Sequence, residues 1–251
     1  MFIDSKNDKI LLGTGAGSYI LKRIEGARKE IKIVSPYLTP SYIEKILALA
    51  HKGVRVTLIT SDEIKEGDGR FSQLSNRHIV LQQRTLDDGA KKERDIGLLS
   101  AGLGLAVSVG FLIYSGVGIL LLGLLAISGF FFWKFYTKRI YTYQYDSPLK
   151  LRVFVSPRSH LFKQAGMRSE TPNAHLVHAK VYVIDEEVAF VGSVNFTHDG
   201  LYKNYESCVT VLDKTAISAI SKEVDSLFHS KDNCFLNLND WGRQVYGEPP
   251  N

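Results

Sequence analysis

The sequence has few cysteines, and this scarcity limits the kinds of site that it can build. Cys208 and Cys234 are the only two among 251 residues, and they do not have the spacing of a metal-ligand pair. Cys208 lies within the apolar run SCVTVL, which indicates a buried structural thiol. The sequence therefore contains no Cys-based metal motif, and nothing in it requires an oxidising compartment.

Two other signals are missing near the N-terminus. The segment MFIDSKNDK is charged and has no apolar core of the kind that a secretory signal peptide needs, so we expect no cleaved signal. Gly13, Gly15 and Gly17 do not complete a Gly-x-Gly-x-x-Gly pattern, and no Lys-Ser/Thr follows them as in a P-loop. We therefore expect a tight turn that leads into a helix, not a nucleotide-binding loop.

Charged residues are absent from Ile96 to Trp133. As one helix this run would extend about 57 Å, whereas the hydrocarbon core of a bilayer is about 30 Å thick. A division near Tyr114 to Gly118 gives two segments of suitable length. The run therefore predicts a transmembrane helical hairpin over residues 96–136. The alternative, a buried core hairpin of a soluble protein, is disfavoured because the run has no polar alternation.

The residues around this run indicate its orientation. Basic residues flank it on both sides: Lys91, Lys92 and Arg94 precede it, and Lys134, Lys138 and Arg139 follow it. Basic flanks favour the cytoplasmic side of a membrane, so we expect an integral membrane protein whose soluble domain faces the cytoplasm. Small residues at every fourth position would let the two helices approach closely: Ser100, Gly104 and Ser108, and Gly102, Ala106 and Gly110.

The rest of the chain alternates between strand and helix patterns. We expect strands at 9–13, 31–35, 54–60, 149–156, 175–185, 186–193 and 205–212, and helices at 18–30, 41–53 and 215–230. Ser41 is the expected N-cap of the second helix. This alternation predicts an α/β fold whose sheet begins with largely parallel strands. Residues 1–95 and 137–230 are expected to be the two halves of one domain, and 231–251 a tail without decisive periodicity.

The polar residues of the segment from His178 to Val211 form two pairs. Side chains at i and i+2 share one face of a strand, so His178 and Lys180 are expected to point the same way while Ala179 faces the core. Ser193 and Asn195 form a second such pair just after the next apolar strand. A helix is expected to follow Asn195 and to offer backbone N–H groups at its N-terminus.

This set of side chains suits a phosphodiester. Lys180 would offset the phosphate charge, and Ser193 and Asn195 would donate hydrogen bonds to its oxygens. His178 can attack phosphorus and divide the transfer into two displacements through a phosphohistidine. A carboxylate would fix the histidine tautomer, and Glu206 is the candidate. A metal site is not expected, because His175 and His178 would lie on opposite sides of a strand.

The motif order resembles that of a known family. His178-x-Lys180-x4-Asp185, then Gly192-Ser193-x-Asn195, then Asn204-Tyr205-Glu206 are similar to the signature of the phospholipase D superfamily. The resemblance is greatest to its small single-motif members, the bacterial endonuclease type and the mitochondrial phospholipase-like type. It implies a mixed sheet flanked by helices and chemistry that needs neither metal nor cofactor.

The resemblance also implies a role for each motif residue. His178 would be the nucleophile, Lys180 and Asn195 would bind phosphate, and Ser193 would assist them. Glu206 would orient His178, and Asp185 would support the site structurally. Many members carry two such motifs in one chain, but this sequence contains one. A second histidine is still needed to protonate the leaving alcohol, so we expect a homodimer that shares one site.

The substrate stays open at this point. Nucleic acid is favoured by the run GSVNFT and by a net charge of +5, although that charge permits an anionic partner without demanding one. Phospholipid of the bilayer, as in a phospholipase D or cardiolipin hydrolase, is favoured by the predicted membrane anchor. Two further readings are a phospholipase D-like module that binds nucleic acid or lipid without turnover, and a membrane scaffold that recruits partners.

Overall fold

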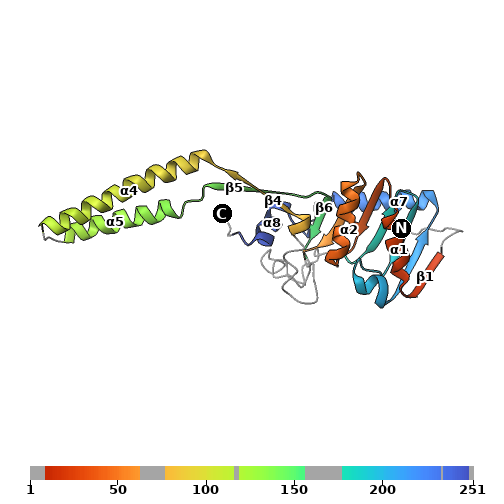
Figure 1. Cartoon of the computed structure of the whole chain (residues 1–251). Coiled ribbons are helices and arrows are strands. Elements are labelled where there is room, and N and C mark those ends of the chain that lie inside the picture. Colours follow the sequence, from red (N-terminus) through yellow and green to blue (C-terminus); the bar gives the residue numbers. More distant parts are fainter. Residues whose placement is uncertain (1–8, 63–76, 116–118, 156–176, 233, 249–251) are drawn as a thin grey trace. The chain divides into compact units, whose positions relative to one another are not determined.

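The computed structural model of the chain describes residues 9–62, 77–115, 119–155, 177–232 and 234–248. These residues form two compact units (Figure 1). The first contains the chain up to Gln82 and again from Tyr145, and the second is Gln83–Gln144. The larger unit carries the predicted chemical residues, and the smaller one carries the apolar run.

The first unit is built on a seven-stranded mixed sheet. Its strand order is β1 (Lys9–Thr14), β9 (Tyr205–Val211), β8 (Val188–Gly192), β7 (Lys180–Ile184), β2 (Glu30–Val34), β3 (Arg55–Ser61) and β6 (Lys150–Phe154). Only β2, β3 and β6 run parallel to one another, and every other pairing in this sheet is antiparallel. The mixed sheet is confirmed, but the largely parallel start is wrong, because β1 pairs with β9 at the edge and not with β2.

Helices cover both faces of this sheet. On one face lie α1 (Ala16–Glu25) and α2 (Pro40–His51), where the Tyr19 ring packs edge-on against Phe190. On the other face lies α7 (Lys214–Phe228), which packs on Val183, Ala189 and Val211 (Figure 1). Because successive side chains of a strand point to opposite faces, each central strand contributes to both cores.

Lys32 is a charged residue buried beneath α7. It lies in β2 with 5% of its surface exposed. Its ammonium donates to Ser221 Oγ at 2.9 Å and to both oxygens of the Asp225 carboxylate at 2.7 Å. A buried charge is tolerated only where it is paired and hydrogen-bonded, so these contacts fix the position of α7 on the sheet.

The ends of the first two helices differ partly from expectation. Thr39, not Ser41, is the N-cap of α2, because Pro40 occupies the first turn and suits that position. Helix α1 ends at Glu25 and not at residue 30, since the backbone N–H groups of residues 28–30 donate to the Asp185 carboxylate instead of to helix carbonyls. The turn predicted before α1 is confirmed, and Gly15 adopts a left-handed φ of 76° there.

The segment predicted as a tail contains a helix. Helix α8 (Leu238–Tyr246) buries Trp241 to 2% exposure, and its Gly242 leaves room for the ring of Tyr145. Just before it, Phe235 packs edge-on against Phe154 of β6. The sequence showed isolated apolar residues here, and these are the residues that attach the segment to the sheet.

The second unit is a helical hairpin entered through two strands. Strands β4 (Leu81–Leu86) and β5 (Tyr141–Asp146) pair with each other, and helices α4 (Asp88–Ser115) and α5 (Ile119–Tyr136) pack side by side. The division near Tyr114 to Gly118 is confirmed. Helix α4 begins eight residues before the predicted start of the hairpin, with the Asp87 carboxylate accepting from the N–H of Ala90 at 2.9 Å.

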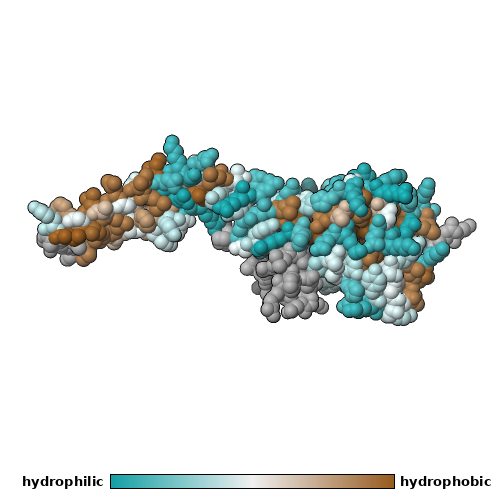
Figure 2. All heavy atoms as spheres, viewed as in Figure 1, coloured by the Kyte–Doolittle hydropathy of each residue, from teal (hydrophilic) through white to brown (hydrophobic). Residues whose placement is uncertain are grey.

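The outward surface of the hairpin is apolar (Figure 2). Leu99 is 73% exposed and Ile113 is 79% exposed. Among the described residues, Asp88–Phe111 is the one helical stretch whose length and composition would let it cross a membrane, and Leu122–Tyr136 is a shorter apolar helix. The spanning hairpin thus remains a prediction.

Small residues line part of the contact between the two helices. Gly104 lies against Ser128, Gly97 lies against the ring of Phe135, and Ser108 is buried. The second predicted set does not take part, because a side chain at Gly102 or Gly110 would meet open space. The two predicted sets are offset by two residues, and residues two apart on a helix do not share a face, so the second set points away from the contact that the first set makes.

Candidate active site

Three strand ends meet at one edge of the sheet and bring the predicted residues together. Strands β7, β8 and β9 are antiparallel neighbours, so the end of β8 adjoins the starts of β7 and β9. Lys180 is the first residue of β7 and pairs with Gly192, the last residue of β8. Ser193 follows Gly192 directly, and Glu206 is the second residue of β9. This register places Lys180, Ser193 and Glu206 at a common edge.

His178 and Lys180 are in direct contact. The Lys180 Nζ lies 3.0 Å from Nδ1 and 3.1 Å from Nε2 of His178, and it donates to the His178 carbonyl oxygen at 2.9 Å. His178 is exposed, whereas Lys180 is 5% exposed. Strand β7 begins at Lys180, so His178 precedes the strand instead of lying within it. Ala179, predicted to face the core, is exposed.

The environment of Lys180 changes its acidity. Burial lowers the pKa of the Lys180 ammonium below its ordinary value, and the negative charge of Glu206 opposes this shift in part. A buried amine is easier to deprotonate because the low-dielectric surroundings disfavour its charged form. A bound phosphodiester anion would favour the charged form of Lys180 and so oppose the effect of burial.

Glu206 is held by neighbours other than the one predicted. Ser193 Oγ donates to the Glu206 carboxylate, and Asn204 Nδ2 donates to its Oε1 at 3.2 Å. Ser193 Oγ also accepts from the N–H of Ser207 at 3.0 Å. Among the described hydrogen bonds none joins Glu206 to His178, so the predicted orienting contact is not seen here. The carboxylate instead fixes Ser193, and Asn204, which had been given no role, supports it.

Asn195 has an unused polar atom. Its side chain is half-buried, and its Oδ1 is buried without a hydrogen-bond partner among the described residues. Buried polar atoms are nearly always satisfied, so this acceptor is suited to a hydrogen-bond donor of a ligand, whereas a phosphate oxygen would need the Nδ2 donor of the same amide.

The loop from Ser193 to His198 is anchored by residues that the sequence pattern did not reveal. Ser35 Oγ accepts from the N–H of Phe196 at 3.0 Å, and the N–H of Thr39 donates to the Phe196 carbonyl at 3.1 Å. Tyr182 donates its hydroxyl to the Val194 carbonyl at 2.7 Å. These contacts come from the segment after β2 and from β7, and they hold the loop in place.

The helix expected after Asn195 is only a five-residue π-helical turn, η1 (Asp199–Lys203). A helix does follow Asn195, but the N–H groups of Gly200 and Leu201 in this turn already donate to Thr197 and are not available to an anion. The turn packs closely instead: a side chain at Gly200 would meet the backbone of Asn195, and one at Gly17 would meet Leu201.

Gly192 is required by the close approach of two strands. A Cβ at this position would meet the Ser207 carbonyl and lie 2.7 Å from Cys208 Cα. These are backbone atoms of β9, which cannot move aside without breaking the pairing. Glycine therefore lets Ser193 approach Ser207 and Glu206.

Asp185 directly follows β7, at the end opposite the edge where Lys180, Ser193 and Glu206 lie. Its carboxylate accepts backbone N–H groups from Lys29 at 2.7 Å and from Arg28 and Glu30 at 2.9 Å. Burial acts to raise the pKa of Asp185, but these three donors outweigh it and hold the pKa below its ordinary value. Its contacts are those of a structural residue that ties the β7–β8 turn to the start of β2.

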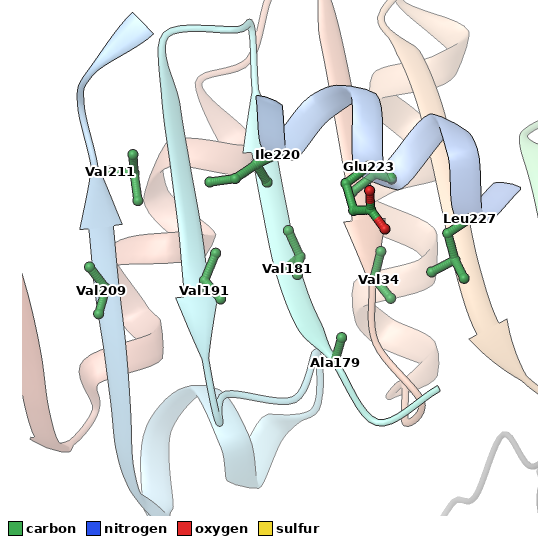
Figure 3. A pocket seen from close by; sticks show the side chains of 10 residues that line it. Val34, Ala179, Val181, Val191, Val209, Val211, Ile220, Glu223 and Leu227 are labelled. Carbon is green, nitrogen blue, oxygen red and sulfur yellow. The ribbon is translucent and has the colours of Figure 1, made fainter. Parts of the chain in front are cut away.

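An apolar hollow of about 440 Å³ lies on the α7 face of the sheet (Figure 3). Ala179, which separates His178 from Lys180 in the chain, lines one end of it. Most of the other lining residues are aliphatic: Val181, Val191, Val209, Ile220 and Leu227. The hollow therefore reaches the same edge of the sheet as the polar cluster, from the opposite face.

One family model agrees with the motif over part of the chain. Residues 126–229 match the family model described as cardiolipin synthase, PLD-like domain. No curated protein sequence matches the chain. Among solved structures, NucT from Helicobacter pylori is similar at 13% identity and a TM-score of 0.45, over 89% of this chain and 96% of that one.

Two further solved structures are similar. One is Nuc from Salmonella typhimurium, described as a phospholipase D family member, at 15% identity and a TM-score of 0.42, over 88% of this chain and 93% of that one. The other is a phosphatidylserine synthase from Haemophilus influenzae, at 14% identity and a TM-score of 0.41, over 96% of this chain and 44% of that one.

Proposed function

We propose that this chain is a phosphodiester-acting enzyme of the phospholipase D superfamily, whose family model matches residues 126–229, and that it is a membrane-anchored, metal-independent nuclease that acts through a phosphohistidine at His178. The observation that carries the proposal is the contact between the His178 ring and the Lys180 ammonium, at the edge where Ser193 and Glu206 also lie. An exposed imidazole beside a fixed cation is an arrangement that can attack a diester anion.

The proposed reaction has two displacements. In the first, a ring nitrogen of His178 forms a bond to phosphorus while the bond to the leaving oxygen breaks. The partner subunit's His178, protonated, gives its proton to that oxygen. In the second displacement, the partner subunit's His178, now neutral, removes a proton from water. The water oxygen bonds to phosphorus while the bond between phosphorus and the nucleophilic His178 breaks. Lys180 and Asn195 hold the non-bridging oxygens, and Glu206 acts by positioning Ser193.

Nucleic acid is the favoured substrate, with phospholipid as the second candidate. The positive net charge of +5 supports the first. The apolar hollow that ends at Ala179 supports the second, because an acyl chain could lie in it while the headgroup reaches His178. The apolar hairpin surface would hold the domain beside a bilayer in either case.

The test is an assay of the full chain in detergent, with EDTA present, on a fluorescent oligonucleotide and on a labelled phospholipid. Cleavage of the oligonucleotide, lost in His178→Asn and kept in His51→Asn, is the expected result. His51 is a suitable control because it is exposed at the end of α2. Activity on lipid alone would favour the second candidate, and inactivity on both would favour a binding module.

The proposed dimer has a separate test. Wild-type and His178→Asn chains are co-expressed in known ratios and purified together. If each site needs two His178 side chains, an equal mixture retains about a quarter of the wild-type activity, since random pairing leaves that share of intact dimers. Retention of half the activity would contradict a shared site.

A further inference from the structure

A second hollow of about 620 Å³ lies near Asp185, at the end of β7 opposite the catalytic edge. The end of α1 and the segment that follows it form one wall, and the β7–β8 turn forms the other. The lining residues are Tyr19, Lys22, Arg23, Gly26, Arg28, Lys29, Ile184, Asp185 and Glu187. None of them belongs to the catalytic cluster.

The hollow is positively charged. Four of its lining residues carry a positive charge, and within the described part of the chain none of those four forms an ion pair. Of the two acidic lining residues, Asp185 accepts three backbone N–H groups and interacts electrostatically with Lys29, and Glu187 is exposed, so positive charges exceed negative ones by four to two in the lining. The nearby acids Glu25 and Glu30 are paired with Lys45 and Arg55. A concave surface with this balance attracts anions.

Tyr19 adds an aromatic surface to this basic hollow. Its side chain is 44% exposed, and its ring is held edge-on by Phe190 with the centroids 5.8 Å apart. Basic grooves with exposed aromatic rings suit single-stranded nucleic acid, because the cations contact the phosphates and the ring stacks on a base. A bilayer surface would instead be met by protruding apolar side chains beside the cations.

We propose that this hollow, the Tyr19 hollow, is a second binding subsite for single-stranded nucleic acid. The inference rests on the proposed nuclease function and deepens it by naming the strand type and a second contact. Lys180 and Asp185 are five residues apart along an extended strand, a distance of about 17 Å. About five stacked nucleotides at 3.4 Å each span the same length. A substrate held at both places must therefore be longer than a few nucleotides.

The test compares a single-stranded 20-mer with a dinucleotide substrate. In the double variant Lys22→Glu/Lys29→Glu, both positions are exposed, so the fold should be retained. The KM for the 20-mer should rise at least about tenfold, and the slope of log affinity against log salt should fall by about 1.4, the value for two lost contacts with a single strand. The dinucleotide should be cleaved as by wild type.

Two controls separate this site from a general effect of charge. Lys214→Glu/Lys222→Glu makes the same charge change at exposed positions of α7 and should leave the KM for the 20-mer unchanged. Tyr19→Phe should behave as wild type, whereas Tyr19→Leu should weaken 20-mer binding, because only the former keeps a ring that stacks. An equal effect of both double variants would overturn the proposal.

Binding is also measured by fluorescence anisotropy in the His178→Asn background, so that the subsite is tested apart from turnover. If the chain cleaves no oligonucleotide but binds the 20-mer through Lys22 and Lys29, the subsite stands and the nuclease function fails. If cleavage proceeds and the double variant matches wild type on both lengths, the subsite fails alone. If the double variant Lys22→Glu/Lys29→Glu loses binding to phosphatidylserine in mixed detergent micelles but binds the 20-mer as wild type does, the proposal is overturned in favour of a lipid surface.

Discussion

Among single residues, Lys180 should set the alkaline limit of activity. Burial lowers the pKa of its ammonium, so this charge is lost at a pH below the ordinary lysine value of about 10.5. As the pH rises through that lowered pKa, KM should increase, because the phosphate loses its cation. A pH profile of KM and kcat checks this, with Lys180→Arg as the comparison. Arginine stays protonated, so any activity it retains should show no such limit.

Asp185 should contribute to stability in a pH-dependent way. Its pKa is lowered by the N–H donors of residues 28–30, so its contribution is full above the unfolded-state pKa and is lost as the pH falls through the lowered folded-state pKa. Asp185→Asn should cost about 2 kcal/mol at neutral pH, the scale of hydrogen bonds to a charged group. Denaturant unfolding at pH 7 and near pH 3 measures this.

The choice of asparagine keeps the backbone unchanged. Asp185 has a left-handed φ of 55°, a conformation that asparagine tolerates well. The difference in stability between variant and wild type should narrow as the pH falls and the Asp185 carboxylate is protonated. A difference that stays constant with pH would contradict a role for the charge.

The sequence predicted some of the site at this scale. The positions of Lys180 and Ser193 at one edge follow from the strand pattern and the motif order, but the contact of His178 with Lys180 does not follow from strand periodicity, because His178 lies before β7. The contact of Glu206 with Ser193 and Asn204 does not follow from the sequence either, because the direction of a side chain among several hydrogen-bonding neighbours depends on the packed fold. Ser35 and Thr39 lie more than 130 residues from the loop that they anchor, and neither belongs to a motif.

Among elements, the attachment of α7 depends on an asymmetric ion pair. The Lys32 side chain is 6% exposed, and that of Asp225 is 51% exposed. Asp225→Asn would leave a buried ammonium without its counter-charge, whereas Lys32→Met would leave a carboxylate that water can still reach. We expect Asp225→Asn to cost about 2 kcal/mol, below the 3–5 kcal/mol of fully buried pairs, and Lys32→Met to cost less.

Thermal unfolding of the two variants and the double variant measures this asymmetry. The double variant Lys32→Met/Asp225→Asn should be more stable than Asp225→Asn alone, since it removes the unpaired buried charge. If Lys32→Met is the more destabilising single change, the ion pair is not what holds α7.

The elements that the sequence predicted share a clear physical signal. The central strands are apolar runs and the core-facing helices are amphipathic, so their positions follow from periodicity. Strand β4 reads LQQRTL and is mostly exposed, so it shows no apolar alternation. The pairing of β1 with β9 joins residues about 200 positions apart, and no local pattern determines such a partner.

At the scale of the whole molecule, the hairpin should be separable from the catalytic domain. The N–H of Asp87 donates to the Ile140 carbonyl at 2.9 Å, so the chain leaves and returns at adjacent points. Replacing residues 88–139 with Asn-Gly, which forms a tight two-residue turn between paired strands, should give a soluble protein. Cell fractionation should find it outside the membrane, and circular dichroism should show retained strand and helix signals.

The activity of this variant shows whether oligonucleotide cleavage needs the hairpin. Cleavage of oligonucleotides should be retained, because the catalytic cluster lies in the other unit. A variant that unfolds or stays in the membrane fraction would contradict the modular insertion.

The order of the strands in the chain also constrains biosynthesis. Strands β2 and β3 emerge from the ribosome before the hairpin, but their neighbours β6 and β7 are made after it, and β1 waits for β9. At about 5–20 residues per second, the interval between completion of β3 and of β9 is roughly 8–30 s. The two apolar helices are therefore complete before the sheet can close, and the strands made before them lack part of their pairing partners until β9 has been synthesised.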